Sequence, residues 1–177
     1  MRFLSAILVV LALAWPAISV AQTGGDWHRV APLGEHFVVK MPSEPERSVK
    51  KTSTFAGTVE DVSYRARHRA GTYIATRVDL PGVATFFMSD DSLLEEIRKS
   101  FLEQGDGVEK SYMDVERDGY AGKKLDFIRK MPDGDEDARA EFFVVEGQML
   151  SFTGIVPQGH SMEDIDRFLA TIDITED

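Results

Sequence analysis

The sequence contains no cysteine. Disulfide bonds, thiol nucleophiles, thiolate metal ligands and lipid attachment to an N-terminal cysteine are therefore excluded. Small domains in oxidising compartments often depend on disulfides, so this chain must gain its stability from an apolar core instead. We expect a domain with enough buried surface to fold without covalent crosslinks.

Histidine is also scarce, with four in 177 residues. No two of His28, His36, His68 and His160 have the spacing of a zinc site on a helix or a loop. The sequence has no G-x-S-x-G nucleophile elbow, and no histidine has a local partner pattern for a serine or threonine nucleophile. We therefore expect a protein without enzymatic activity, catalytic residues, metal ion or cofactor.

Basic residues are outnumbered, with 20 Lys and Arg against 30 Asp and Glu, which gives a net charge of −10. Such a surface repels nucleic acid and anionic lipid over most of its area. We expect no nucleic-acid partner, and no membrane association once the N-terminal leader is removed.

A long apolar run occurs only in this leader, where Phe3–Trp15 is nearly all apolar and a proline follows. The run is shorter than the ~20 residues of a spanning helix. Ser19 and Ala21 supply the small residues of a signal-peptidase site. We predict a signal peptide over 1–21, with cleavage between Ala21 and Gln22, and hence an exported protein that is periplasmic or secreted. An uncleaved membrane anchor is the alternative.

The remaining chain reads as a flexible polar lead-in over 22–26 and a single domain over 27–177. Roughly 150 residues can bury about 68–70% of their unfolded surface in one core. We find no internal repeat and no interdomain linker, and the oligomeric state expected is a monomer.

Period-two alternation of apolar and polar side chains predicts half-buried antiparallel strands over much of this domain. The predicted strands cover His36–Met41, Thr58–His68, Tyr73–Leu80, Val108–Arg117, Gly122–Lys130, Ala138–Val145 and Gln148–Val156. Pro42 ends the first because it lacks the N–H of a sheet ladder, and Ser43–Pro45 continues as an extended turn. Asp118-Gly119, Pro132–Gly134 and Glu146-Gly147 have turn chemistry.

Two segments have helical periodicity. The first, Ser89–Gln104, begins with a serine N-cap, and the second begins at Ser161 with Asp164 completing a capping-box variant. Their apolar stripes are Leu93, Leu94, Ile97, Phe101 and Leu102, then Met162, Ile165, Phe168, Leu169 and Ile172. Strands joined by tight turns pair antiparallel, and amphipathic helices must cover sheet faces. We predict an α+β fold with a mainly antiparallel sheet of about six to seven strands sandwiched by helices.

Three groups of residues resemble a known pattern. They are an opening of Trp27, Phe37, Val39, Met41, Pro42 and Pro45, a mid-chain GYAGKKLDF over 119–127, and a close over 142–174. Together they resemble the bacterial PsbP-like family, whose fold is shared with the photosystem II extrinsic protein PsbP and a Ran-binding nuclear transport factor. The resemblance implies a sheet with helices on both faces and a binding or assembly protein. It implies no ligand-binding residue, because the matching motifs are structural.

The segment YRARHRAG is the leading candidate site. Arg65, Arg67 and Arg69 alternate along one predicted strand, so they project from one face about 6–7 Å apart. Guanidinium groups in a row suit a carboxylate or phosphate, because each can donate a bidentate pair. An exposed strand face or edge, neutralised by nearby acids, is the alternative.

Two further segments are weaker candidates. Phe86 and Phe87 precede the first helix and form either an exposed docking patch or an anchor for that helix in the core. Asp133, Asp135 and Asp137 resemble the start of a calcium loop, but the sequence lacks its glycine and closing glutamate, which favours a solvated hairpin tip.

Three functions follow. The leading hypothesis is an exported, non-catalytic binding or assembly protein with an unknown protein or envelope partner. The second is a periplasmic small-anion carrier or sensor that uses the Arg65, Arg67 and Arg69 row. An unrecognised hydrolase is the third.

Overall fold

The computed structural model describes residues 27–54, 57–69, 71–80, 88–104 and 106–175. The predicted signal peptide, the lead-in and the Phe86–Phe87 patch lie outside these residues. The described strands and helices are β1 (His28–Val30), β2 (Phe37–Met41), β3 (Glu46–Thr54), β4 (Gly57–His68), β5 (Gly71–Asp79), α2 (Asp90–Gln104), β6 (Val108–Arg117), β7 (Tyr120–Arg129), β8 (Glu136–Val145), β9 (Gln148–Pro157), α3 (Glu163–Leu169) and β10 (Asp173–Ile174).

Seven of the strands form one antiparallel sheet in the order β3-β4-β5-β9-β8-β7-β6. The other three form a small sheet in the order β1-β2-β10. The chain therefore has an α+β fold, and the predicted antiparallel sheet is confirmed.

Tight hairpin turns account for this topology. Asp118 and Gly119 join β6 to β7 with φ values of 51° and 85°, and Glu146 and Gly147 join β8 to β9 with 47° and 79°. Two successive residues with positive φ are typical of a type I′ turn, whose twist matches that of the paired strands. Both turns lie where the sequence predicts them.

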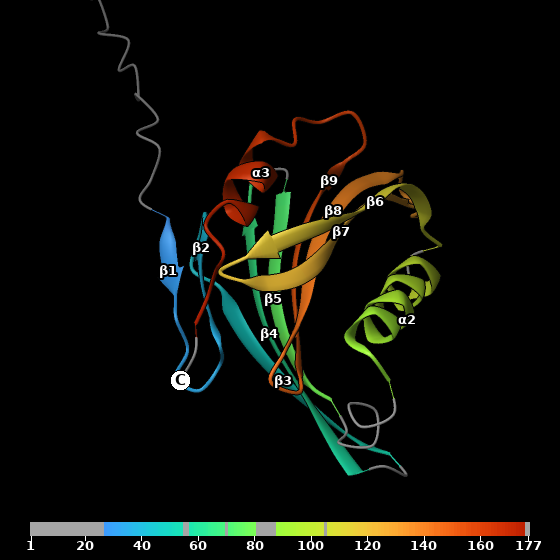
Figure 1. Ribbon diagram of the computed structural model, residues 1–177. Coiled ribbons are helices and arrows are strands. Elements are labelled where there is room, and N and C mark those ends of the chain that lie inside the picture. Colours follow the sequence, from blue (N-terminus) through green and yellow to red (C-terminus); the bar gives the residue numbers. More distant parts are fainter. Residues whose placement is uncertain (1–26, 55–56, 70, 81–87, 105, 176–177) are drawn as a thin grey trace, which may run out of the picture.

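The two faces of the large sheet are buried by different elements (Figure 1). On one face, α3 and the small sheet enclose a core that includes Phe37, Phe152 and Phe168. On the other face, α2 packs on β7 and β8 over Phe127 and Phe142. This arrangement confirms the predicted sandwich of helices around a sheet.

The side chains of strand β9 alternate between the two faces of the large sheet. Leu150 and Phe152 are fully buried in the core below α3, whereas Ser151 and Thr153 point to the α2 side. Gly154 lies directly under α3, where a Cβ would come within 2.4 Å of the Ile165 side chain. The absence of a side chain at this position lets α3 lie close to the sheet.

Strand β3 and the small sheet were not predicted in full. The segment Glu46–Thr54, for which the sequence predicts no element, is a nine-residue strand at the edge of the large sheet. Strands β1 and β10 have three and two residues, too few for a periodic pattern.

The N-terminus of α3 also differs from the prediction. The helix begins at Glu163, and its N-cap is Met162, which makes no side-chain capping hydrogen bond. The Ser161 hydroxyl instead accepts a hydrogen bond from the Glu163 N–H at 3.2 Å, two residues along the chain. Serine favours such local turns outside helices, so the predicted capping box is wrong. By contrast, Ser89 caps α2 by accepting from the Ser92 N–H.

Among the described helices, neither is long and apolar enough to cross a membrane.

Candidate functional site: an open groove beside helix α2

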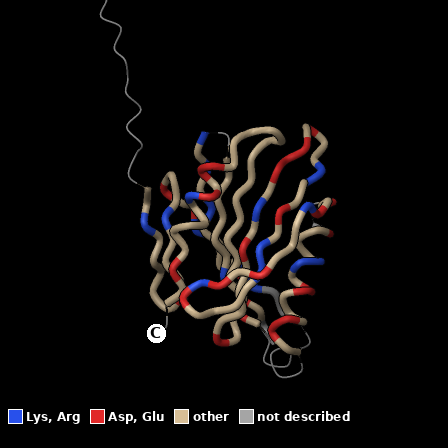
Figure 2. The backbone as a smooth tube through the Cα atoms, turned by 45° about the horizontal axis from the view of Figure 1, so that its top comes forward, with Lys and Arg blue, Asp and Glu red and all other residues tan. Residues whose placement is uncertain are grey.

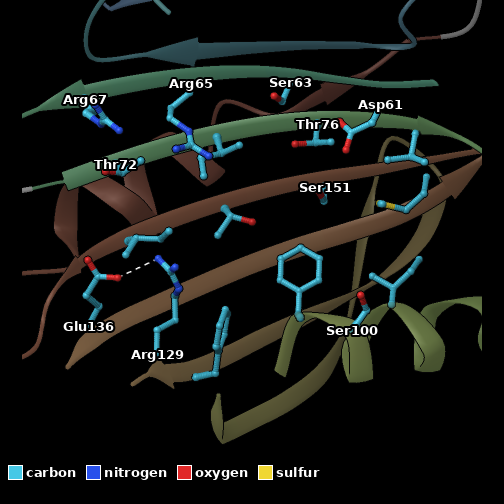
Figure 3. A pocket seen from close by; sticks show the side chains of 18 of the residues that line it. Asp61, Ser63, Arg65, Arg67, Thr72, Thr76, Ser100, Arg129, Glu136 and Ser151 are labelled. Atoms are coloured by element: carbon cyan, nitrogen blue, oxygen red, sulfur yellow. Dashed lines mark hydrogen bonds and ion pairs between the residues drawn. The ribbon is translucent and has the colours of Figure 1, made fainter. Parts of the chain in front are cut away.

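Helix α2 covers only part of its face of the sheet. It packs on β7 and β8, and the neighbouring strands β9, β5 and β4 continue beyond it. The uncovered part forms a groove of about 650 Å³ that is bounded on one side by α2 (Figure 3). This volume is within the range of about 300–1,000 Å³ typical of small-molecule sites.

Strand β4 lines one side of the groove with every second residue. Asp61, Ser63, Arg65 and Arg67 all face into it, while the residues between them face the opposite core. Figure 3 shows the two arginines at one end of the strand and Asp61 at the other. The predicted alternation therefore holds for Arg65 and Arg67.

Arg69 is placed differently from these two. Strand β4 ends at His68, which pairs with Gly71, so Arg69 is in the turn. Its φ of 50° is in the left-handed region, and its side chain is exposed and does not line the groove. The alternation predicted from the sequence stops two residues earlier than expected, because the pairing of β4 with β5 ends at His68.

Arg65 and Arg67 are both exposed. Within the described ranges, neither forms an ion pair or a side-chain hydrogen bond. Glu46 lies opposite Arg65 on β3 and is the nearest competing carboxylate by sheet register. Most other basic groups are already paired, and Figure 2 shows acidic and basic residues interspersed along the same strands.

A third arginine reaches the same end of the groove but is neutralised. Arg129 on β7 donates to Glu136 on β8 with an Nη1–Oε2 distance of 2.8 Å (Figure 3). Two strands, β5 and β9, separate this pair from β4. The unpaired positive charge of the groove is therefore concentrated at Arg65 and Arg67.

Hydroxyl groups line the floor between the charged side and α2. Thr72 and Thr76 come from β5, and Ser151 and Thr153 come from β9. The two β9 residues are 4% and 7% exposed, so their hydroxyls lie at the bottom of the groove. Hydroxyls in this position can donate hydrogen bonds to a bound anion or accept them from a polar ligand group.

The wall on the α2 side is apolar and rigidly supported. Phe101 stacks on Phe142 with ring centroids 5.6 Å apart and meets Phe127 edge-on at 6.3 Å. Further along the helix, Arg98 lies over the Tyr112 ring at 4.7 Å. Burial raises the pKa of Tyr112, consistent with its packing beneath the helix. These contacts hold α2 in place as one side of the groove.

The histidines do not contribute to this site. His28 is on β1, His36 is in the bend before β2, His68 ends β4, and His160 is in the loop before α3. None of them lines the groove. A groove with arginines, hydroxyls and apolar side chains can bind and orient an anion, but it offers no histidine as a general base.

The acidic hairpin segment makes other contacts. Asp135 accepts from Lys130 at 2.5 Å, Asp137 accepts from Lys110 at 2.6 Å, and Asp133 is exposed. The Lys110 ammonium group lowers the pKa of Asp137, with a smaller contribution from the Gly159 N–H. In the described part of the chain, no group of three or more histidine or acidic residues has the arrangement of a metal site.

Sequence reasoning singled out Arg65 and Arg67, which line the groove, and Arg69, which does not, and it missed the rest of the groove. Arg129, Glu136 and Phe101 come from strands and a helix distant in the sequence, and the floor hydroxyls join them through the pairing of β5 with β9. The one available signal was the row of Thr72, Ile74 and Thr76 in β5, which puts polar groups on the side opposite the Tyr73 core.

Comparisons with known proteins give the fold. No protein-family model matches the sequence, and no curated protein matches it. Among solved structures, the chain is similar to cyanobacterial PsbP from Synechocystis, with 12% identity and a TM-score of 0.60 over 90% of this chain and 99% of that one. It is also similar to a protein of unknown function from Pseudomonas aeruginosa, with 14% identity and a TM-score of 0.41 over 82% and 92% of the two chains.

A protein from Bacteroides thetaiotaomicron is similar at 12% identity and a TM-score of 0.49, over 87% of this chain and 50% of that one. The likeness to cyanobacterial PsbP confirms the PsbP-like fold that the sequence motifs predict. At this level of identity it concerns the fold, and function must be argued from the groove.

Proposed function

We propose that this protein is an exported, non-catalytic binding protein that captures a small organic anion in the groove beside α2. The observation that carries the proposal is that Arg65 and Arg67, at one end of a groove floored with hydroxyls, have guanidinium groups without a partner among the described residues. The third arginine of the groove, Arg129, already forms an ion pair with Glu136. An anion bound there would gain bidentate hydrogen bonds without breaking an existing ion pair.

The size of the groove favours a small molecule over a polymer. Its volume of about 650 Å³ suits a ligand of drug size. A polyanion would extend beyond the groove and meet the acidic surface of the rest of the chain. Export is proposed from the signal peptide that the sequence predicts over 1–21.

Ligand-induced thermal stabilisation tests the proposal. The purified protein, its Arg65→Ala/Arg67→Ala double variant and an Arg29→Ala control are melted with a panel of organic carboxylates and phosphates. Arg29 is an exposed arginine on β1, outside the groove. At a ligand concentration about ten times Kd, binding stabilises by about 1.4 kcal/mol. For a domain of this size, that corresponds to a Tm increase of about 3–6 °C.

We expect the increase in the native protein and in Arg29→Ala, and its loss in the double variant. An equal Tm increase in the double variant would show that Arg65 and Arg67 do not bind the ligand. If no member of the panel stabilises the native protein, the proposal fails.

A protein partner is the second candidate function. Strand β3 pairs only with β4 among the described strands, so its outer edge offers backbone hydrogen-bonding groups to another chain. Val49 on this strand is 42% exposed. A photoreactive residue at position 49 should crosslink to one specific exported protein. Crosslinks within the same chain alone would contradict an assembly role.

A further inference from the structure

The side chains of the groove change character across the strands. In the register of the sheet, Arg65 on β4 lies beside Ile74 on β5, which lies beside Thr153 on β9. In the next row, Arg67 lies beside Thr72, which lies beside Ile155. Beyond β9, the aromatic wall of Phe101 and Phe127 begins. The groove is thus cationic at β4, mixed over β5 and β9, and apolar at α2.

The distance from the arginines to the aromatic wall limits the length of a ligand that contacts both. Neighbouring strands are about 4.8 Å apart, so β4 and β9 are separated by about 10 Å. The arginine side chains reach inward from one side and the aromatic rings from the other. The space between them accommodates a short linker and a ring or a short alkyl chain, but not a long hydrocarbon tail.

Asp61, at the end of β4 opposite the arginines, limits the charge of the ligand. Asp61 lies about 13 Å along the strand from Arg65, by the rise of four residues. A second anionic group at that end of the groove would meet this carboxylate. The Arg129–Glu136 pair also adds no net charge at the near end. Both features favour a ligand with one anionic head over a dianion with separated charges.

From these features we infer that the groove selects an amphiphilic monocarboxylate. Its carboxylate is bound by Arg65 and Arg67, and its aromatic or short alkyl body crosses Ile74 and Ile155 toward the Phe101 wall. Thr72 and Thr153 lie between the two ends, where they can hydrogen-bond a polar linker. The inference rests on the proposed function, because it names the ligand class of that same site.

Isothermal titration calorimetry with four probes tests the ligand class. The probes are 4-phenylbutyrate, acetate, inorganic phosphate and the neutral alcohol 4-phenylbutanol. We expect 4-phenylbutyrate to bind at least tenfold more tightly than acetate or phosphate, because burying the ring removes apolar surface from water. We expect the alcohol to bind at least tenfold more weakly than 4-phenylbutyrate, because it cannot pair with the arginines.

Two isoleucine variants test the orientation. Ile74→Thr replaces an apolar side chain of the groove floor with a hydroxyl. The strand already has threonines on this face at positions 72 and 76. The substitution should weaken 4-phenylbutyrate binding about three- to tenfold and leave acetate binding unchanged. Ile128→Thr is the matched control, because Ile128 is also a half-buried strand residue but does not line the groove. It should change neither affinity.

The outcomes separate the ligand class from the proposed function. Equal affinities for 4-phenylbutyrate, acetate and phosphate, all lost in Arg65→Ala/Arg67→Ala, would overturn the inference that the ligand is amphiphilic. The same result would still support the proposed anion site. Absence of binding by all four probes would count against both. If Ile74→Thr unfolds, Arg65→Lys gives a second test: it keeps the charge but loses the bidentate fork, and should weaken 4-phenylbutyrate and acetate by the same factor.

Discussion

The hydroxyl of Tyr64 donates a hydrogen bond to Oε1 of Glu35 over 3.0 Å, linking β4 to the bend before β2. Arg47 on β3 donates to the same hydroxyl from its Nε atom at 3.1 Å. Burial raises the pKa of Tyr64, so its hydroxyl stays protonated and able to donate at neutral pH. This contact joins the segment before β2 to the large sheet, and the Tyr64 and Glu35 side chains are each 7% exposed.

Removing this hydroxyl should destabilise the protein. In Tyr64→Phe, Glu35 remains buried and loses its hydrogen bond to Oε1, which keeps only the Arg47 guanidinium at 3.8 Å, while Oε2 already has no partner among the described residues. An unsatisfied buried acceptor costs about 1–3 kcal/mol. Urea unfolding monitored by circular dichroism should show a reduction of that size in the free energy of unfolding.

Tyr73→Phe is the control for this change. Tyr73 is 2% exposed, and its hydroxyl makes no hydrogen bond to any described residue. Its loss should alter the free energy of unfolding by less than about 0.5 kcal/mol. Equal effects of the two substitutions would show that the Tyr64–Glu35 bond contributes nothing specific.

A second prediction concerns the ion pair between Asp126 on β7 and Arg139 on β8, an arginine that also contacts α3. Arg139 on β8 donates from Nε and Nη2 to both oxygens of Asp126 on β7, at 2.5 and 3.1 Å, and also contacts Asp166 on α3. Burial alone would raise the pKa of Asp126, but hydrogen bonds and charge from Arg139 outweigh it, so the pKa is lowered. The deprotonated carboxylate is therefore the form that stabilises the fold.

The sign of the pH dependence follows from this shift. A carboxyl group with a lowered pKa in the folded state contributes stability above its unfolded pKa of about 3.9, and that contribution is lost as the pH falls. Asp126→Asn should reduce the free energy of unfolding by about 1–3 kcal/mol at pH 7. Urea unfolding at a series of pH values should show the difference from the native protein shrinking below pH 4. A difference that stays constant down to pH 2 would contradict the assignment.

A third prediction uses the close approach of α3 to β9. In Gly154→Ala, the new Cβ would come within 2.4 Å of Ile165, so the helix must shift away from the sheet. Overpacking of this kind costs about 1–3 kcal/mol. Thermal unfolding should show a Tm lower by about 2–12 °C for a domain of this size.

A double variant separates this clash from a general effect of alanine in the strand. Ile165→Ala alone should destabilise by about 2–5 kcal/mol, because it leaves a cavity in the core. Combined with Gly154→Ala, it should destabilise by less than the sum of the two, because the added Cβ then occupies part of the vacated space. Strict additivity would mean that the two side chains do not meet.

Local signals accounted for what the sequence could predict. The turns at Asp118-Gly119 and Glu146-Gly147 need residues that tolerate positive φ, and the chain has them at those positions. The apolar stripe of α2 has helical spacing, and Leu94 is buried as that spacing requires. Each of these features is decided by residues close together in the sequence.

Features decided by distant residues were missed. Strand β3 contains one large apolar residue, Val49, and follows Pro45, so its sequence resembles a loop. It is a strand because it pairs along its full length with β4. The turn at Arg69 was missed for a related reason: the alternating pattern of Arg65 and Arg67 continues past the point where the strand ends.

The double role of β9 has a consequence for binding. A slip of one residue along this strand would turn Leu150 and Phe152 toward the groove and would turn Ser151 and Thr153 toward the core beneath α3. No misregistered form of the chain could keep both its hydrocarbon interior and its polar groove floor. Ligand capture would thus report that the molecule has reached its native strand alignment.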